Sequence, residues 1–214
     1  MLSHCLFTSL PVMIGMAKNQ DDVLLRDRMQ FTFNATGDRT TLYGRIDLSA
    51  YVNPISREGL AIKEVKFQLR EPTQPTFTNT GCFSPVADWQ SASGTAGVLS
   101  AVKIYATTRA YENAAEVGIA SPDVLCVYEK IAVAGANNPT GAGGDLQTYE
   151  YWYGPADLHP DGFTVVSDLL IGIAADNWDL NSNDTVELDV LLVAEPVKIS
   201  TDRINEILSQ AQDL

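Results

Sequence analysis

The stretch "LAIKEVKFQLRE", residues 60–71, is the part of the sequence that decides the fold. Its apolar and polar residues alternate, so that Val65, Phe67 and Leu69 fall on one side and Lys66 falls on the other. A period of two is typical of a β-strand that buries one face and leaves the other in water. We therefore expect a strand here, with odd-numbered residues forming most of its apolar face.

Similar runs recur on both sides of this strand and are separated by turn residues. Gly37, Asp38, Asn53 and Pro54 mark two of these turns, because such residues favour chain reversal over regular structure. No helical pattern alternates with the strands, and no internal repeat is visible. Further strands are predicted at residues 30–35, 41–52, 98–111, 124–134, 146–153, 163–175 and 185–199.

This series of strands predicts an all-β fold, specifically an antiparallel β-sandwich. Because several connections are long, the arrangement that fits best is an eight-stranded jelly roll made of two four-stranded sheets. The last strand contains Pro196, and proline cannot donate a hydrogen bond to a neighbouring strand. We therefore expect an edge position or a bend at that residue.

The two ends of the chain depart from the strand pattern. We assign residues 1–29 to an N-terminal arm, residues 30–199 to the jelly-roll sandwich and residues 200–214 to a short amphipathic helix. In the helix, apolar residues recur at helical spacing, and Ser200 or Thr201 supplies the N-cap.

The first fifteen residues, "MLSHCLFTSLPVMIG", leave three interpretations open. They are a segment upstream of a true start at Met16, an apolar arm that inserts into a partner, or a signal peptide that is removed. The apolar run is short, is broken by Pro11 and follows no Lys or Arg, which is unlike a typical signal peptide.

Charge limits the partners that the chain is expected to bind. The 214 residues carry a formal net charge of −13, with only 14 Lys and Arg and no basic cluster. Gripping a phosphate backbone requires several converging cations. We therefore expect no direct binding of nucleic acid.

The acidic stretch "AADNWDLNSNDTVELDVLLVAEPVKI", residues 174–199, raises the question of a calcium site. If Asp179 is position 1 of a calcium loop, position 6 is Asp184 instead of the usual Gly, and position 12 is Val190 instead of a carboxylate. We expect a polar hairpin turn between two strands, and a looser surface calcium site remains an alternative. Its candidate ligands are Asp176, Asp179, Asn181 and Asp184.

The sequence holds no recognisable catalytic constellation, so we expect neither an enzyme nor a cofactor. The three cysteines, Cys5, Cys82 and Cys126, are widely spaced and give neither a disulfide framework nor a metal-binding pair. His159 lies in a loop near Asp157 and Asp161, which makes this group the remaining acid–base candidate, but no nucleophile motif accompanies it.

Aromatic and apolar residues outside the predicted core are candidates for an interface. The long loop at residues 72–97 and the terminal helix either pack on their own domain or contact a neighbour. The interface candidates are Phe77, Phe83, Trp89, Ile204, Ile207 and Leu208. In "LQTYEYWYG", Tyr149, Tyr151 and Tyr153 share one face and Trp152 lies on the other; we favour core and interface roles for them over a sugar-binding platform.

Two stretches resemble a known family. "RDRMQFTFNATGDRTTLYGRIDLSAYVNPISREGLAIKEVKFQLRE" is similar to the opening of the single jelly-roll capsid (coat) proteins of small tailless viruses, and "VVSDLLIGIAADN…VELDVLLVAEPVKI" is similar to their last two strands. The resemblance covers about half the chain. It implies a structural virion protein, the major capsid subunit, which self-assembles as a homo-oligomer into a shell and contacts other virion proteins.

The chain departs from this family at its N-terminal end. Many such coat proteins have a basic arm that binds the genome, whereas only Lys18, Arg26 and Arg28 precede Gln30 here. The departure leaves an internal membrane or a second protein as alternatives for holding the genome. Two other functions stay open, a phage tail or surface-layer subunit and a carbohydrate-binding module. The module would use Tyr149, Tyr151, Trp152 or Trp178 to stack on sugar.

Overall fold

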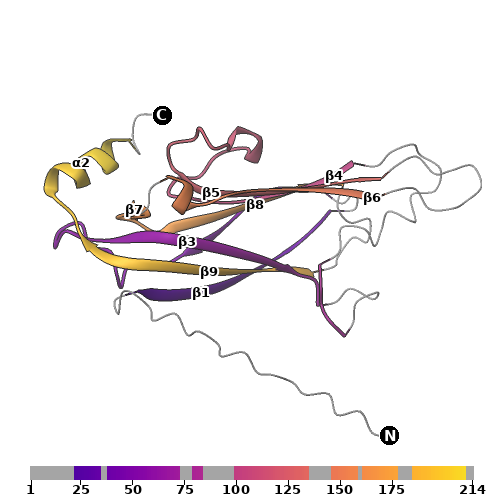
Figure 1. Ribbon diagram of the computed structural model, residues 1–214, viewed down its shortest axis with the longest axis horizontal. Helices are drawn as coiled ribbons and strands as arrows, with labels where there is room; N and C mark the ends of the chain where they lie inside the picture. Colours follow the sequence, from indigo (N-terminus) through magenta and orange to yellow (C-terminus); the bar gives the residue numbers. More distant parts are fainter. Residues whose placement is uncertain are drawn as a thin grey trace, which may run out of the picture.

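The chain folds into two antiparallel β-sheets that pack face to face (Figure 1). The computed structural model describes residues 22–34, 38–72, 79–83, 99–134, 146–158, 161–177 and 185–210. In spatial order, the four-stranded sheet contains β1 (Val23–Thr32), β9 (Thr185–Lys198), β3 (Glu58–Arg70) and β7 (Phe163–Val165). The five-stranded sheet contains β2 (Arg39–Ile46), β8 (Leu169–Asp176), β4 (Leu99–Thr107), β5 (Val124–Ala134) and β6 (Leu146–Tyr153).

The strand pairing is nested and confirms the predicted jelly roll. β1 pairs with β9, β2 with β8, β3 with β7 and β4 with β5. Nested pairs of this kind arise when one long antiparallel ribbon is rolled up into two sheets, which is how a jelly roll is built. β6 adds a further strand beside β5.

The described residues contain nine strands where eight were expected, because the run at residues 163–175 is divided. Its first part is β7, which pairs with β3, and its second part is β8, which pairs with β2 and β4. The chain crosses from one sheet to the other between them. There the Asp168 carboxylate accepts a hydrogen bond from the Leu48 amide and pairs with Arg45.

A β-bulge in β3 changes which residues face the core. Ile62 lies opposite Ala194 and Glu64 lies opposite Val193, so Lys63 is an extra residue without a partner in the register. Because one inserted residue reverses the alternation, Ile62 points inward before the bulge and Val65 points inward after it. The prediction of an odd-numbered apolar face is therefore correct only beyond Lys63.

The main core lies between the sheets and is lined by alternate residues of the central strands. On β9 the inward residues are Val186, Leu188, Val190, Leu192 and Ala194, each at most 3% exposed. They pack in one cluster with Ile104, Ile171 and Ile173 of the opposite sheet. Each such leucine or isoleucine contributes about 1.5–3 kcal/mol by leaving water, so this cluster holds the two sheets together.

A second cluster lies on the outer face of the five-stranded sheet, under the segment at residues 108–123. This segment includes a short 3₁₀ turn, η1 (Ala114–Glu116). The hydroxyls of Tyr43 and Tyr105 lie 2.7 Å apart and share a hydrogen bond. Burial and this bond raise the pKa of Tyr105, so its hydroxyl stays protonated.

The two strands that flank the acidic stretch lie in different sheets. β8 ends at Asp176 in the five-stranded sheet and β9 begins at Thr185 in the four-stranded sheet. The prediction of a hairpin for the acidic stretch is therefore wrong, because consecutive strands that do not pair cannot form a hairpin. β1 and β2, which are separated by the turn predicted at Gly37 and Asp38, also lie in different sheets. Among the described strands, the consecutive ones that pair are β4 with β5 and β5 with β6.

The first strand begins earlier than expected. β1 starts at Val23 rather than near Gln30 and pairs with β9 over its whole length. Residues 23–29, which were assigned to the N-terminal arm, therefore belong to the sheet. Pro196 lies beyond the last residue of β9 that pairs with β1, which is Ala194. Within the described ranges, one side of β9 is open there, as an edge position requires.

The C-terminal helix α2 (Thr201–Gln210) is present as predicted and lies at one end of the sandwich (Figure 1). The Ser200 hydroxyl accepts a hydrogen bond from the Arg203 amide at 3.2 Å and so caps the helix. Ile204 is only 5% exposed and packs with Val166 and Ile199. The apolar face of α2 is thus already docked on its own domain.

Gly172 provides a direct test of the second cluster. A Cβ at this position would lie 2.3 Å from Cζ of Tyr105, so we expect Gly172→Ala to lower the free energy of unfolding by about 1–3 kcal/mol through overpacking. A Cβ at Gly118 meets nothing within 4 Å, which makes Gly118→Ala the matched control. Urea unfolding measures both variants, and equal stabilities would contradict this packing.

Candidate functional site

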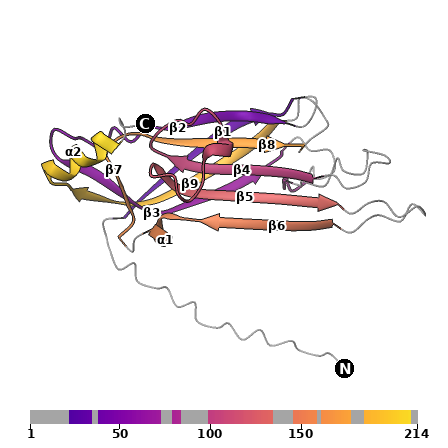
Figure 2. The ribbon, with the colours of Figure 1, turned by 90° about the horizontal axis from the view of Figure 1, so that it is seen from above.

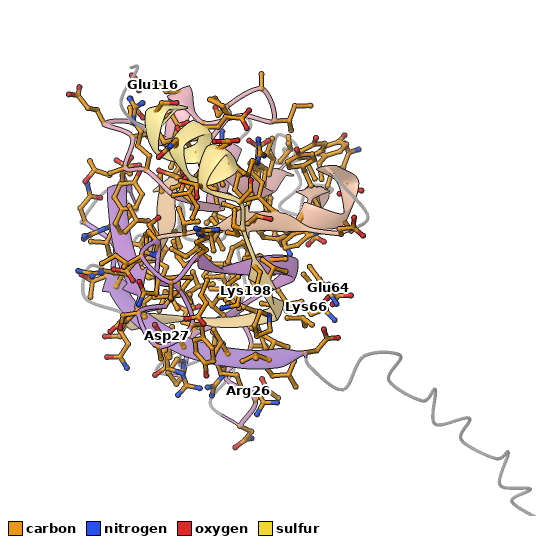
Figure 3. All side chains as sticks on the ribbon, turned by 90° about the vertical axis from the view of Figure 1, so that its left-hand side faces the viewer. Arg26, Asp27, Glu64, Lys66, Glu116 and Lys198 are labelled. Carbon is orange, nitrogen blue, oxygen red and sulfur yellow. The ribbon has the colours of Figure 1, made fainter. Side chains whose placement is uncertain are left out.

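The outer face of β1, β9 and β3 is covered by charged side chains of both signs, and we call it the charged face. Figure 3 shows Arg26 on β1, and Glu64 with Lys66 on β3. The Lys66 ammonium lies 3.0 Å from the Glu64 carboxylate. The basic members are Arg26, Arg28, Lys63, Lys66 and Arg70, and the acidic members are Asp22, Glu64, Glu187, Asp189 and Glu195. The charges on this face balance, although the whole chain carries −13.

Cross-strand ion pairs tie the three strands of the charged face together. Arg28 Nε lies 2.5 Å from Asp189 Oδ1, and Arg70 reaches Glu187 at 3.3 Å. Glu187 also accepts a hydrogen bond from the Gln30 amide at 2.9 Å. The hydrogen bond from Arg28 is the main reason that the pKa of Asp189 is lowered. Charge-assisted bonds of this kind are stronger than neutral ones, so the network adds to the pairing of these strands.

A second surface lies on β6, at the edge of the five-stranded sheet (Figure 2). Tyr149 is 57% exposed and Tyr151 is 45% exposed, and both project from the outer face of the sheet. Trp152 projects from the other face, and its ring packs edge-on against Phe67 at 5.8 Å between centroids. The sequence prediction that Trp152 lies opposite the tyrosines is confirmed.

The single acid on β6 is neutralised by the neighbouring strand. The Glu150 carboxylate lies 2.7 Å from the Lys130 ammonium, and this bond lowers the pKa of Glu150. Glu150 also accepts a hydrogen bond from the Tyr128 hydroxyl at 3.3 Å. The surface of β6 is therefore aromatic, without a net charge of its own.

A groove of about 660 Å³ opens between the segment that contains η1 and strands β2, β4, β5 and β8. Its lining is largely apolar and includes four charged residues, Arg39, Lys103, Glu129 and Asp176. Lys103 is already paired with Glu129 at 2.9 Å. The cation nearest the centre of the sheet is thus neutralised within the chain.

Of the calcium candidates, the structure describes Asp176 alone, whose side chain is exposed at the edge of this groove. Asp179, Asn181 and Asp184 lie outside the described residues. Within the described ranges, no group of three His, Cys, Asp or Glu side chains is placed to hold a metal ion. The calcium site therefore stays a prediction.

The interface candidates fall into three groups. Phe77 and Trp89 lie outside the described residues, as does the side chain of Leu208. Phe83 packs against the main core. Ile204 and Ile207 pack against Val166, Val197 and Ile199 of the same chain. Intramolecular packing thus already covers much of the surface of Ile204 and Ile207. A role for the six candidates between copies stays a prediction.

The acid–base candidate is only partly described. His159 lies outside the described residues, and Asp157 accepts a hydrogen bond from the Gly154 amide at 2.8 Å. Cys126 is buried in the core, where burial raises the pKa of its thiol to about 12, and Cys82 is exposed. A thiol with such a raised pKa is a poor nucleophile.

Sequence reasoning missed the charged face, although a signal for it was present. Arg26 and Arg28 are two residues apart, as are Glu187 and Asp189, and this spacing puts each pair on one face of a strand. The sequence does not reveal which strands are neighbours. The ion pairs therefore became visible only when the pairing of β1 with β9 was known.

Comparison with models of known protein families found no match, and comparison with curated proteins also found none. Across the described residues, every helix is too short or too polar to cross a bilayer. The function must therefore be argued from the fold and from these surfaces.

The charged face should make stability depend on pH. A lowered pKa in the folded state means that Asp189 stabilises the fold above the ordinary aspartate pKa of about 4, and that this stabilisation is lost as the pH falls through the folded pKa. We expect Asp189→Asn to cost about 1–2 kcal/mol at pH 7 and to flatten the acid limb of the stability curve. Denaturant unfolding between pH 7 and acid measures both effects.

The matched control for this experiment is Glu112→Gln, which neutralises an exposed acid in the segment at residues 108–123. It should leave the acid limb unchanged. If Asp189→Asn behaves in the same way as the control, the network contributes nothing to stability.

Proposed function

We propose that the chain is a structural subunit that assembles with copies of itself into a virion shell, as the major coat protein of a small tailless virus. The observation that carries the proposal is the nested strand pairing, β1 with β9, β2 with β8 and β3 with β7. Viral coat domains are prominent among the proteins that use this architecture. The fold alone does not determine function, so the surfaces must support the proposal as well.

The two stretches that resemble coat proteins support this proposal by their position. They are far apart in the sequence. The first stretch supplies most of β1 and all of β2 and β3, and the second supplies β8 and β9. These strands pair with one another in both sheets. The resemblance therefore covers connected structural units and not scattered segments.

The exposed aromatic residues of β6 support contacts between copies. Tyrosine and tryptophan are enriched at protein interfaces, because they bury a large apolar area at little cost in side-chain entropy. Tyr149, Tyr151 and Trp152 are each at least 44% exposed in the single chain. Contacts with copies of the chain would cover them.

The charged face supports a shell protein that does not itself bind the genome. Four of its five cations, Arg28, Lys63, Lys66 and Arg70, lie within 4 Å of an acidic side chain. Cations that are neutralised within the chain have little to offer a phosphate backbone. A second virion protein or an internal membrane would then hold the genome, and the proposal assigns no reaction and no cofactor to the chain.

A carbohydrate-binding module is the second candidate, favoured by Tyr149 and Tyr151. Their positions two residues apart on one strand put the side chains about 7 Å apart, a spacing suited to neighbouring sugar rings. Glycan-array binding that is lost in Tyr151→Ala would favour this candidate. The other aromatic residue considered for it, Trp178, lies outside the described residues.

Assembly should respond to salt in a way that follows from the charge. Copies that each carry −13 repel one another, and raising the ionic strength from about 0.01 to 0.15 M shortens the screening length from about 30 to 8 Å. We therefore expect salt to promote assembly of the purified chain. Sedimentation velocity measures the oligomers, and negative-stain electron microscopy shows their shape.

Each outcome of this experiment has a clear meaning. Closed particles support the coat protein. Tubes or flat sheets would favour a tail or surface-layer subunit. A chain that stays monomeric at high concentration and at every ionic strength contradicts the proposal.

A further inference from the structure

The sandwich has four edge strands, and three of them carry features that prevent pairing with another chain. β7 is only three residues long. β2 has a register irregularity between Arg39 and Leu42. β1 presents three consecutive charged residues, Arg26, Asp27 and Arg28. Short length, bulges and charge are the usual means by which edge strands avoid pairing with other chains.

β6 lacks each of these features. It runs for eight residues, and its register with β5 is unbroken from Val127 opposite Tyr153 to Ala134 opposite Leu146. Its sequence, "LQTYEYWY", contains no proline, lysine or arginine. Within the part of the chain that the structure describes, no strand pairs with the far side of β6 (Figure 2).

The charge on β6 also favours a second copy of the same strand. The whole chain carries a net charge of −13, so two copies repel each other at long range. On β6, the only acid is Glu150, and Lys130 neutralises it at 2.7 Å. This edge therefore combines open backbone groups, exposed aromatic rings and no net repulsion.

We propose that β6 pairs antiparallel with β6 of a second copy, so that two five-stranded sheets become one ten-stranded sheet. The inference rests on the proposed self-assembly and names one of its contacts. The backbone hydrogen bonds of the open edge would be satisfied by the identical edge of the partner, as in other cases of strand addition.

Symmetry restricts the register of this contact. An antiparallel pair of identical strands is related by a two-fold axis perpendicular to the sheet. Side chains opposite each other must lie on the same face, so one residue always lies opposite its own copy. With Tyr151 on the axis, Tyr149 lies opposite Tyr153, and Glu150 lies opposite Trp152 and not opposite another Glu150. This register also pairs Tyr149, Tyr151 and Tyr153 with one another, and aromatic cross-strand pairs stabilise sheets.

Cysteine crosslinking tests the pairing directly. Single cysteines are placed at each of residues 148–152 in a full-length chain that carries Cys5→Ser and Cys82→Ser and retains the buried Cys126. The residue on the axis has its own copy at a distance that suits a disulfide. We expect one of the five variants, Tyr151→Cys, to form a disulfide-linked dimer on mild oxidation. A dimer at any one of the five positions supports the pairing and fixes its register.

Ile119→Cys is the matched control, because Ile119 is 58% exposed but lies away from the sheet edges. Random collisions would crosslink it as readily as the β6 variants. Crosslinking of the control to the same extent, or of none of the β6 variants, overturns the pairing.

A charge substitution tests whether assembly needs this contact. Tyr151→Lys puts two lysines close together across the axis, and like charges opposite each other destabilise a strand pair. We expect the concentration for half-maximal dimerisation to rise by about tenfold or more, which corresponds to about 1.4 kcal/mol. Ile119→Lys adds the same charge elsewhere and should leave it unchanged, and circular dichroism confirms that both variants fold.

The two proposals fail in different ways. Shells that form normally from Tyr151→Lys would overturn the β6 contact and leave the coat protein standing. A wild-type chain that is monomeric under all conditions would overturn both.

Discussion

The pairing of β9 with both β1 and β3 is the constraint on which the rest of the structure depends. β9 lies between these two strands, and its inward side chains form much of the core between the sheets. Its outward Glu187 and Asp189 bind arginines of both neighbours, Arg28 and Arg70. One strand thus fixes the sheet through its backbone, its apolar face and its charged face at once.

Much of the fold could be predicted from local pattern. Alternation in residues 60–71 and 185–199 predicted strands correctly, and the spacing of apolar residues predicted the C-terminal helix. These features depend on neighbours in sequence. The bulge at Lys63, the division of residues 163–175 and the passage between sheets after Asp176 depend on which strands pair. No local pattern carries that information. The predicted hairpin and the expected number of eight strands were therefore wrong.

The candidate surfaces divide in the same way. The arrangement of Tyr149, Tyr151 and Trp152 on two faces of one strand follows from a period of two and was predicted. That this strand lies at an edge, with its far side open, follows from the order of strands in the sheet. The terminal helix was expected to contact either a neighbour or its own domain. The packing of Ile204 shows that it contacts its own domain. Exposure, unlike periodicity, is a property of the whole fold.

Nested pairing also has a consequence for how the protein is made. Arg28 bonds with Asp189, 161 residues further along the chain, and ribosomes add about 5–20 residues per second. The first strand therefore waits roughly 10–30 s before its partner emerges. During that delay, the run of charges at Arg26, Asp27 and Arg28 would keep the nascent chain from associating with others on the same polysome. Residues of β1 that later pair with β9 would thus first reduce association between nascent chains during synthesis.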